Sequence, residues 1–253
     1  MNILLCNDDG IDAIGIRTLI NALAPCHRVC VVAPAVQQSA VSKALTLYSP
    51  LRAERRLLPD HPEIEAYAVM GTPVDCIRLG LGNLIKEGPD MVISGINIGP
   101  NLGTDTLYSG TCAAAQEASL YGLNSIALSC RSFNPKHMET SAMIGLRMAA
   151  YAAGRPLPFG AYYNVNVPDL PYESLLGIKL TQLGILRYED EYIRRTDTIG
   201  RDYYWAPRQK LSELDGADTD ERWIAEGYVT VTPLSYNNEV CGLDVEGLDE
   251  VIA

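Results

Sequence analysis

The amino-acid sequence predicts an α/β fold with a doubly wound, mostly parallel sheet, for two reasons. Over about the first 180 residues, short apolar runs rich in β-branched residues alternate with segments of helical periodicity. Polar loops that contain glycine follow several of these apolar runs. The alternation favours crossover helices between parallel strands, and loops that follow such strands lie at one edge of the sheet.

The predicted elements come in this order along the chain. Apolar residues recur at helical spacing between Ile14 and Leu23, and turn residues such as Gly154 and Pro156 mark where helices end. Strands are expected at residues 1–6, 29–34, 91–94, 124–130 and 228–232. Besides the helix that begins near Ile14, helices are expected at residues 112–121, 141–153 and 218–226. The first strand, helix and second strand then require a right-handed crossover.

Residues 187–202 break this pattern. Nine of these sixteen residues are charged, and tyrosines interrupt or flank the segment. Almost no aliphatic residue is present, so the segment is predicted to form an extended β-hairpin arm that turns near residues 196–200 and packs on another subunit. A disordered loop is the alternative, which the aromatic residues disfavour. We therefore assign residues 1–180 to a catalytic core and residues 181–253 to an arm and return segment used in oligomerisation, within one domain overall.

Composition and charge exclude several classes of protein. The chain has 253 residues, 47% of them hydrophobic, and a formal net charge of −11. A negative surface repels nucleic acid and anionic membranes, so neither a duplex nor a membrane is an expected partner. No apolar run reaches the length of a membrane span, and the start of the chain is too short in apolar residues for a signal peptide. We expect a cytoplasmic protein.

The strongest chemical signal is a pair of carboxylates, Asp8 and Asp9, directly after the first predicted strand. A bend at Gly10 could turn both carboxylates towards one hard cation, which would remove their mutual repulsion. The alternative is that an aspartate caps the next helix, and for this pair taken alone that alternative is the stronger one. Two further polar loops reverse the preference.

Those two loops add neutral oxygen ligands. The loop after the second strand contains Ser39, whose hydroxyl could bind a metal or a phosphate. The glycine-rich loop after the strand at residues 91–94 contains Asn97, which offers an amide oxygen. Together with the two carboxylates, these groups predict a hard-cation site that faces a phosphate.

A third group of residues is a candidate for phosphate binding. Ser109, Gly110 and Thr111 immediately precede an alanine-rich helix, so backbone N–H groups and the helix dipole could face an anion there. A plain helix N-cap provided by Thr111 is an equally good interpretation of that loop alone. We assign substrate-phosphate binding to Asn101, Ser109, Gly110 and Thr111.

At this point the sequence resembles a known family. The stretches concerned are ILLCNDDG, QQSAVSKALTL, GTPVDCIRLG, PDMVISGINIGPNLGTDTLYSGTCAAAQE, YNVNVP and GYVTVTPL. They resemble the SurE family of survival-protein nucleotidases over nearly the whole chain. The resemblance implies a Rossmann-like core with an extended C-terminal arm, and subunits assembled as a homodimer or homotetramer.

The resemblance also implies an activity. It is the hydrolysis of nucleoside 5′-monophosphates, with 3′-monophosphates and short polyphosphate as further substrates. One divalent metal ion per subunit, Mg²⁺ or Mn²⁺, is implied, with the family's ligands falling on Asp8, Asp9, Ser39 and Asn97. Asp8 and Asp9 are then the catalytic candidates, and Asp9 is the better candidate to steer or deprotonate the attacking water. Ala40 departs from the glycine expected there, which bears on substrate preference.

Three other interpretations compete with this one. A haloacid-dehalogenase-type phosphatase needs two aspartates separated by one residue, whereas Asp8 and Asp9 are adjacent. A dinucleotide-binding oxidoreductase needs a G-x-G-x-x-G turn after the first strand, where this chain is acidic. A nucleotide or metal sensor without catalysis is not excluded by the residues, although a complete set of metal ligands disfavours it.

Overall fold

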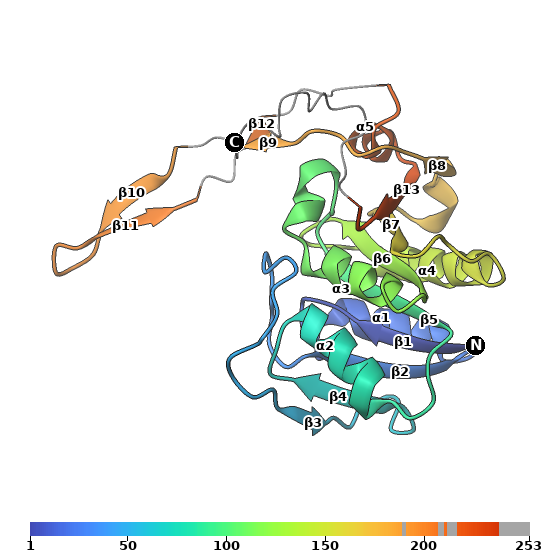
Figure 1. Ribbon diagram of the computed structural model, residues 1–253. Helices are drawn as coiled ribbons and strands as arrows, with labels where there is room; N and C mark the ends of the chain where they lie inside the picture. The colour runs from blue at the N-terminus through green and yellow to red at the C-terminus, as the bar shows by residue number, and fades with distance from the viewer. Residues whose placement is uncertain (189–190, 207–209, 212–216, 238–253) are drawn as a thin grey trace, which may run out of the picture.

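The computed structural model describes residues 1–188, 191–206, 210–211 and 217–237, and a nine-stranded sheet forms its centre (Figure 1). In order across the sheet, the strands are β3 (Ala53–Arg55), β4 (Glu65–Val69), β2 (Arg28–Pro34), β1 (Asn2–Cys6), β5 (Met91–Ile98), β6 (Asn124–Arg131), β7 (Ala161–Pro168), β13 (Val229–Ser235) and β8 (Ile178–Leu180). Neighbouring strands are parallel except in the pairs β3–β4 and β7–β13. The predicted α/β class is confirmed.

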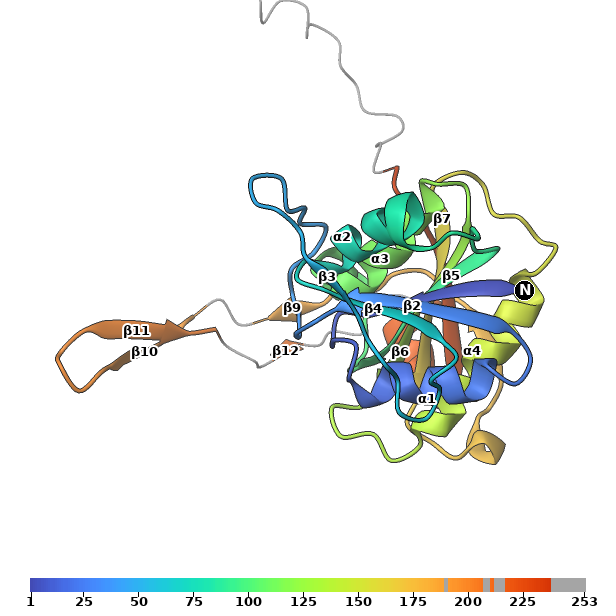
Figure 2. The ribbon, with the colours of Figure 1, turned by 90° about the horizontal axis from the view of Figure 1, so that it is seen from below.

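Helices cover both faces of the sheet. One face carries α1 (Ile14–Leu23) and α4 (Met138–Ala152), and the other carries α2 (Pro73–Leu79) and α3 (Gly110–Ser119) (Figure 2). A short helix, α5 (Asp220–Ala225), precedes β13, and single turns lie at η1 (Gly80–Leu84), η2 (Gly103–Leu107) and η3 (Tyr172–Ser174). None of the helices among the described residues is both long enough and apolar enough to cross a membrane.

The position of β1 at the centre of the sheet explains why its sequence is one apolar run. Side chains alternate between the two faces of a strand. Ile3 and Leu5 pack into the core beneath α1 and α4, whereas Leu4 and Cys6 pack into the core beneath α2 and α3. Both faces are covered, so β1 has no polar side.

The chain reverses direction across the sheet at β1. From β1 it crosses through α1 to β2 on one side, and β5 later pairs with β1 on the other side. The loops that leave β1 and β5 therefore diverge and open a crevice at the carboxyl ends of the strands. Ligands of open α/β sheets bind at such a switch point.

Three predicted boundaries need correction. The strand expected at residues 91–94 continues to Ile98, so Asn97 lies within β5 and not in the loop after it. The helix expected at residues 141–153 begins earlier, at Met138, and ends at Ala152. The strand expected at residues 228–232 continues through Pro233 to Ser235. Proline is tolerated there because β8 pairs with β13 only as far as Val231, which leaves one side of β13 without a strand neighbour beyond that residue.

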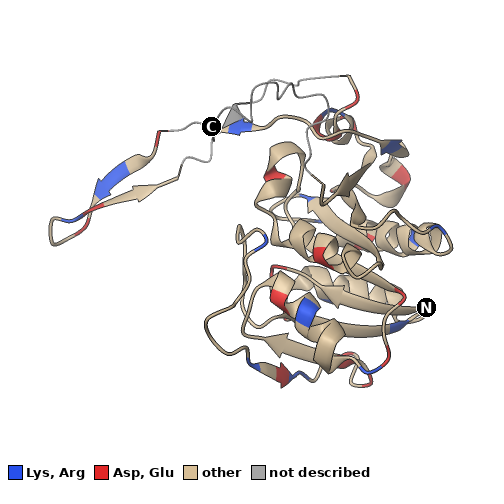
Figure 3. Cartoon of the chain, viewed as in Figure 1, with Lys and Arg blue, Asp and Glu red and all other residues tan. Residues whose placement is uncertain are grey.

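The predicted arm is a two-stranded ribbon that projects from the core (Figure 1). β10 (Ile193–Thr196) pairs antiparallel with β11 (Asp202–Trp205), and β9 (Arg187–Tyr188) pairs with β12 (Lys210–Leu211). Every residue of β10 and β11 is exposed, and β10 carries basic residues (Figure 3). The hairpin is confirmed, whereas the part of the assigned return segment at 238–253 lies outside the described residues.

Candidate metal and phosphate site

The turn after β1 is built by the side chain of Asn7. Its Nδ2 donates to the carbonyl oxygen of Gly10 at 2.8 Å, and its Oδ1 accepts from the Gly10 N–H at 3.2 Å. Gly10 adopts a φ of 102°, a left-handed conformation that favours glycine. The turn places Asp8 and Asp9 at the switch point between β1 and β5.

Asp8 is buried and tied to the start of α3. The Thr111 hydroxyl donates to Asp8 Oδ1 at 2.6 Å, and the Thr111 N–H donates to Oδ2 at 3.1 Å. Burial raises the pKa of Asp8 to about 6, and the charge of Asp9 adds to this, whereas the bonds from Thr111 lower it. A nearby cation would stabilise the ionised form of a carboxylate buried in this way.

Asp9 is less buried and faces the C-terminal end of β5. The Ile98 N–H donates to Asp9 Oδ2 at 3.1 Å, and Gln37 Nε2 lies 3.5 Å from Oδ1. Burial raises the pKa of Asp9 as well, against the bond from Ile98. The Ile98 bond brings Asp9 next to Asn97, although the two residues are far apart in the sequence.

Ser39 and Asn97, the two uncharged candidate ligands, make different contacts. Gln37 Nε2 also donates to Ser39 Oγ at 2.9 Å, which links Ser39 to Asp9. Asn97 lies where the pairing of β5 with β6 shifts register, and its Nδ2 donates to the Gly99 carbonyl oxygen at 2.8 Å. The Asn97 nitrogen is thus engaged, which leaves the amide oxygen as the atom that could bind a metal.

This set of oxygen atoms fits a hard cation. Two carboxylates, a hydroxyl and an amide oxygen are the ligands that Mg²⁺ and Mn²⁺ accept. Within the described residues, no group of three or more His, Cys, Asp and Glu side chains is placed to hold a metal. Any site here would therefore depend on the neutral ligands Ser39 and Asn97 as much as on the carboxylates.

The loop that carries Ser39 is unusual in its backbone. Ala40 and Ser42 have φ values of 59° and 53°, in the left-handed region. Such a conformation costs a residue with a Cβ about 1–2 kcal/mol relative to glycine. The backbone of Ala40, which stands where glycine was expected, is therefore strained. Hydrogen bonds made by other residues must hold the loop. Ser42 provides two of these bonds. Its N–H donates to the Tyr108 carbonyl oxygen, and its hydroxyl donates to the Leu107 carbonyl oxygen.

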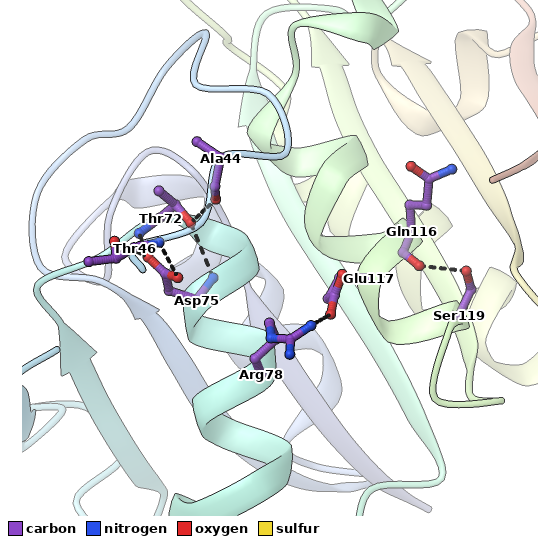
Figure 4. Close-up of polar contacts among 8 residues, drawn as sticks. All are labelled: Ala44, Thr46, Thr72, Asp75, Arg78, Gln116, Glu117 and Ser119. Carbon is purple, nitrogen blue, oxygen red and sulfur yellow. Dashed lines mark hydrogen bonds and ion pairs between the residues drawn. The ribbon is translucent and has the colours of Figure 1, made fainter. Parts of the chain in front are cut away.

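Asp75 on α2 anchors the other end of this loop (Figure 4). Its carboxylate accepts from the Thr46 N–H at 3.0 Å and from the Thr46 hydroxyl at 2.6 Å. The same carboxylate forms a capping box with Thr72, and the Thr72 hydroxyl donates to the Ala44 carbonyl oxygen at 2.7 Å. Although burial raises the pKa of Asp75, these hydrogen bonds together lower it. Sequence reasoning missed this residue.

Replacing Asp75 with alanine is expected to lower the free energy of unfolding by about 2 kcal/mol, because a capping box is lost and the Thr46 and Thr72 donors lose their acceptor. Urea unfolding measures this change. Limited proteolysis should cleave the loop at residues 36–47 faster, since its anchor is gone. Asp60→Ala, which removes an exposed ion pair with Arg17, is the matched control. Equal stability of the two variants would contradict the anchoring role.

The phosphate candidates lie at the start of α3, with one correction. Ser109, not Thr111, is the N-cap, since Ser109 Oγ accepts from the Cys112 N–H at 3.0 Å. Thr111 instead directs both of its polar hydrogens to Asp8. Gly110 lies so close to Asp8 that a Cβ added there would be 2.8 Å from the Asp8 Cβ. The loop therefore supports Asp8 directly.

Asn101 is buried and held by β7. Its N–H donates to Asn166 Oδ1 at 2.8 Å, and its carbonyl oxygen accepts from Asn164 Nδ2 at 2.9 Å and Asn166 Nδ2 at 3.0 Å. Asn101 Nδ2 donates to Ser129 Oγ at 2.8 Å, so one of its two amide hydrogens is used. Asn164 and Asn166 were missed by sequence reasoning, although their alternation in YNVNVP places both on one face of a strand.

The fold and this arrangement define a class: α/β proteins that bind their ligand at the carboxyl edge of a doubly wound sheet, here with two adjacent carboxylates beside a helix start. A sequence model described as "Survival protein SurE" matches residues 3–190. A relative from Gloeothece citriformis, named "5'-nucleotidase SurE", is 41% identical and covers 99% of this chain and 95% of its own length. The chain belongs to the SurE family.

Two further comparisons agree with this assignment. A protein of the same name from Cyanothece sp. is 44% identical and covers 94% of this chain and 91% of its own length. The crystal structure of the SurE protein from Aquifex aeolicus has a TM-score of 0.81 and 34% sequence identity. It covers 100% of this chain, and 99% of that protein is matched. The similarity therefore extends through the arm as well as the core.

Proposed function

We propose that this protein is a 5′-nucleotidase, a phosphoric monoester hydrolase that converts nucleoside 5′-monophosphates to nucleoside and phosphate. The observation that carries the proposal is the pair Asp8 and Asp9 after β1. Asp9 accepts from the Ile98 N–H, beside Asn97 in the chain, and is linked through Gln37 to Ser39. Relatives named as 5′-nucleotidases support it, at 41% and 44% identity over most of the chain. By resemblance to the family, 3′-monophosphates and short polyphosphate are proposed as further substrates.

One divalent cation, Mg²⁺ or Mn²⁺, is part of this proposal. Asp8, Asp9, Ser39 and Asn97 would hold it through their oxygen atoms. When bound, such an ion supplies positive charge to the phosphoryl group and offsets the repulsion between the two carboxylates. The same charge would keep both carboxylates ionised despite their burial.

The two aspartates are proposed to have different roles. Both Asp8 oxygens already accept hydrogen bonds from Thr111, so Asp8 is suited to a fixed position and to charge. Asp9 is more exposed than Asp8. It is the better candidate to orient the attacking water and to accept its proton.

The phosphate would bind at the start of α3. The first N–H groups of a helix have no partner within the helix, and they favour an anion. Here the Thr111 N–H is used by Asp8 and the Cys112 N–H by Ser109. The Gly110 N–H, the Ser109 hydroxyl and the second amide hydrogen of Asn101 are the donors proposed for the phosphoryl oxygens.

A phosphate-release assay tests this function. Purified protein is incubated with each of the four common nucleoside 5′-monophosphates, in chelator and then with Mg²⁺ or Mn²⁺ added. Release of phosphate only in the presence of the divalent cation is expected. Full activity in chelator would overturn the metal-dependent mechanism, and no release under any condition would overturn the enzymatic function and favour a sensor.

The arm is proposed to hold subunits together in a homodimer or homotetramer in the cytoplasm. The arm exposes apolar and aromatic side chains, among them Ile193, Tyr204 and Trp205, which are 52%, 59% and 56% exposed. A ribbon of two strands is marginal unless it packs on something.

Deleting residues 193–205, with a short glycine-containing turn to join the ends, is expected to reduce the mass measured by light scattering. The mass should fall because the exposed apolar surface of the arm would no longer join subunits. Tyr48→Ser is the control, because it removes an exposed aromatic ring outside the arm. An unchanged mass in the deletion variant would assign the arm another role.

A further inference from the structure

A cavity lies along α3, the helix whose first residues are the proposed phosphate donors. It encloses about 300 Å³ between the loop that carries Ser42 and Lys43, the first turns of α3, and β7 and β13. This volume is at the lower end of the range of small-molecule sites. The candidate metal ligands do not line it.

The cavity and the proposed phosphate site share two elements, helix α3 and the loop after β2. Cys112, Ala113 and Gln116 on α3 form part of its wall, and α3 begins at the proposed phosphate donors. A helix rises 1.5 Å per residue, so Gln116 lies about 7 Å along α3 from Thr111. A group joined to the phosphate through a sugar would reach this depth. Lys43 comes from the loop that also carries Ser39, so both sites share that loop.

Gln116 is the unexplained group in this cavity. Its side chain lines the cavity and points away from α2 (Figure 4), and the residue is only 5% exposed. Its Oε1 is buried and has no hydrogen-bond partner among the described residues. Buried side-chain amides nearly always form hydrogen bonds in native proteins. A buried amide oxygen without one therefore indicates that a ligand supplies the hydrogen bond.

The remaining walls show the chemistry of that partner. Leu107, Leu183, Leu234 and the buried ring of Tyr162 supply apolar surface. The glutamine amide offers one donor and one acceptor side by side, which is how glutamine pairs with the edge of a nucleobase. An apolar slot with a single donor–acceptor pair suits a flat heteroaromatic ring better than a second anion.

We propose that this cavity binds the nucleoside part of the substrate and that Gln116 hydrogen-bonds the edge of the base. The proposal rests on the nucleotidase function proposed above and adds the specificity-determining residue. It makes a distinctive prediction about stability, because Gln116→Met removes, at similar volume, a buried amide whose oxygen has no hydrogen-bond partner among the described residues. The melting temperature should stay the same or rise, whereas the affinity for nucleoside should fall.

The test measures nucleoside binding without turnover. Adenosine, guanosine, cytidine and uridine are titrated calorimetrically into wild-type protein and Gln116→Met. The dissociation constant of the tightest nucleoside is expected to rise about tenfold or more. In parallel, the ratio of kcat/KM for the matching nucleotide to that for p-nitrophenyl phosphate, which has no base, should fall by a similar factor. Gln182→Met, which changes an exposed glutamine outside the cavity, should leave both quantities unchanged.

The outcomes separate the two proposals. Unchanged nucleoside affinity in Gln116→Met, or wild-type protein that binds no nucleoside while it hydrolyses p-nitrophenyl phosphate, overturns the cavity proposal alone. A fall in melting temperature with equal losses for both substrates also overturns it, because Gln116 would then be structural. Nucleoside binding that depends on Gln116, without any phosphate release, supports the cavity and overturns the enzymatic function.

Discussion

Asp9→Asn is expected to lose roughly 100-fold or more in both Mn²⁺ affinity and phosphate release, because changes to groups that only support metal ligands already cost 10–100-fold. The substitution keeps the shape of the side chain and the acceptor for the Ile98 N–H, so the fold should be retained. Calorimetric titration with Mn²⁺ and the phosphate-release assay measure the two losses, and circular dichroism checks the fold.

Asp12→Asn is the matched control for this result. Asp12 lies in the same loop after β1, but its carboxylate is exposed and pairs with Arg56 at 2.5 Å. It should retain metal affinity and activity. If Asp9→Asn keeps full activity, or if Asp12→Asn loses as much, the carboxylate pair does not form the metal site.

A second large effect is expected from Gly110→Ala. The added Cβ would lie 2.8 Å from the Asp8 Cβ and 3.0 Å from both Asp8 Oδ2 and Pro73 Cγ. Asp8 has no free space in which to retreat, since it is buried and bonded to Thr111. We expect activity to fall roughly 100-fold, as displacements of about 1 Å in an active site do.

The measurement compares Mn²⁺ affinity with inhibition by inorganic phosphate. Displacement of Asp8 predicts that both weaken in Gly110→Ala. Gly82→Ala serves as the control, because nothing lies within 4 Å of a Cβ placed at Gly82. Unchanged Mn²⁺ affinity with lost phosphate inhibition would instead show that Gly110 acts on the anion alone.

Local sequence signals were sufficient for the central part of the fold. β1, α1, β2 and β6 fall within about two residues of their predicted limits, because buried parallel strands and amphipathic helices leave strong patterns in the sequence. β3 and β4 were not predicted, since Ala53–Arg55 and Glu65–Val69 are short and only partly buried. Of these two, only β3 is an edge strand of the sheet. The interior strand β7 (Ala161–Pro168) was not predicted either, although most of its residues are buried.

The candidate site was predictable in its components but not in its contacts. Polar residues at the ends of apolar runs were enough to select Asp8, Asp9 and Asn97. The sequence analysis offered Thr111 as the N-cap, whereas Ser109 fills that position in the structure. The choice follows from a bond between Thr111 and Asp8, residues 103 positions apart. Asp75 was missed for the same reason, since its partner Thr46 is distant in the chain.

β13 lies between β7 and β8, although both neighbours precede it in the sequence. During synthesis, β8 can therefore join the sheet only after residues 229–235 have been made. Until then, one side of β7 is an open edge of unpaired backbone groups, next to apolar surface that Val229 and Val231 later bury. Open edges of this kind pair readily with other chains. We therefore expect the nascent protein to be prone to aggregation until β13 has left the ribosome.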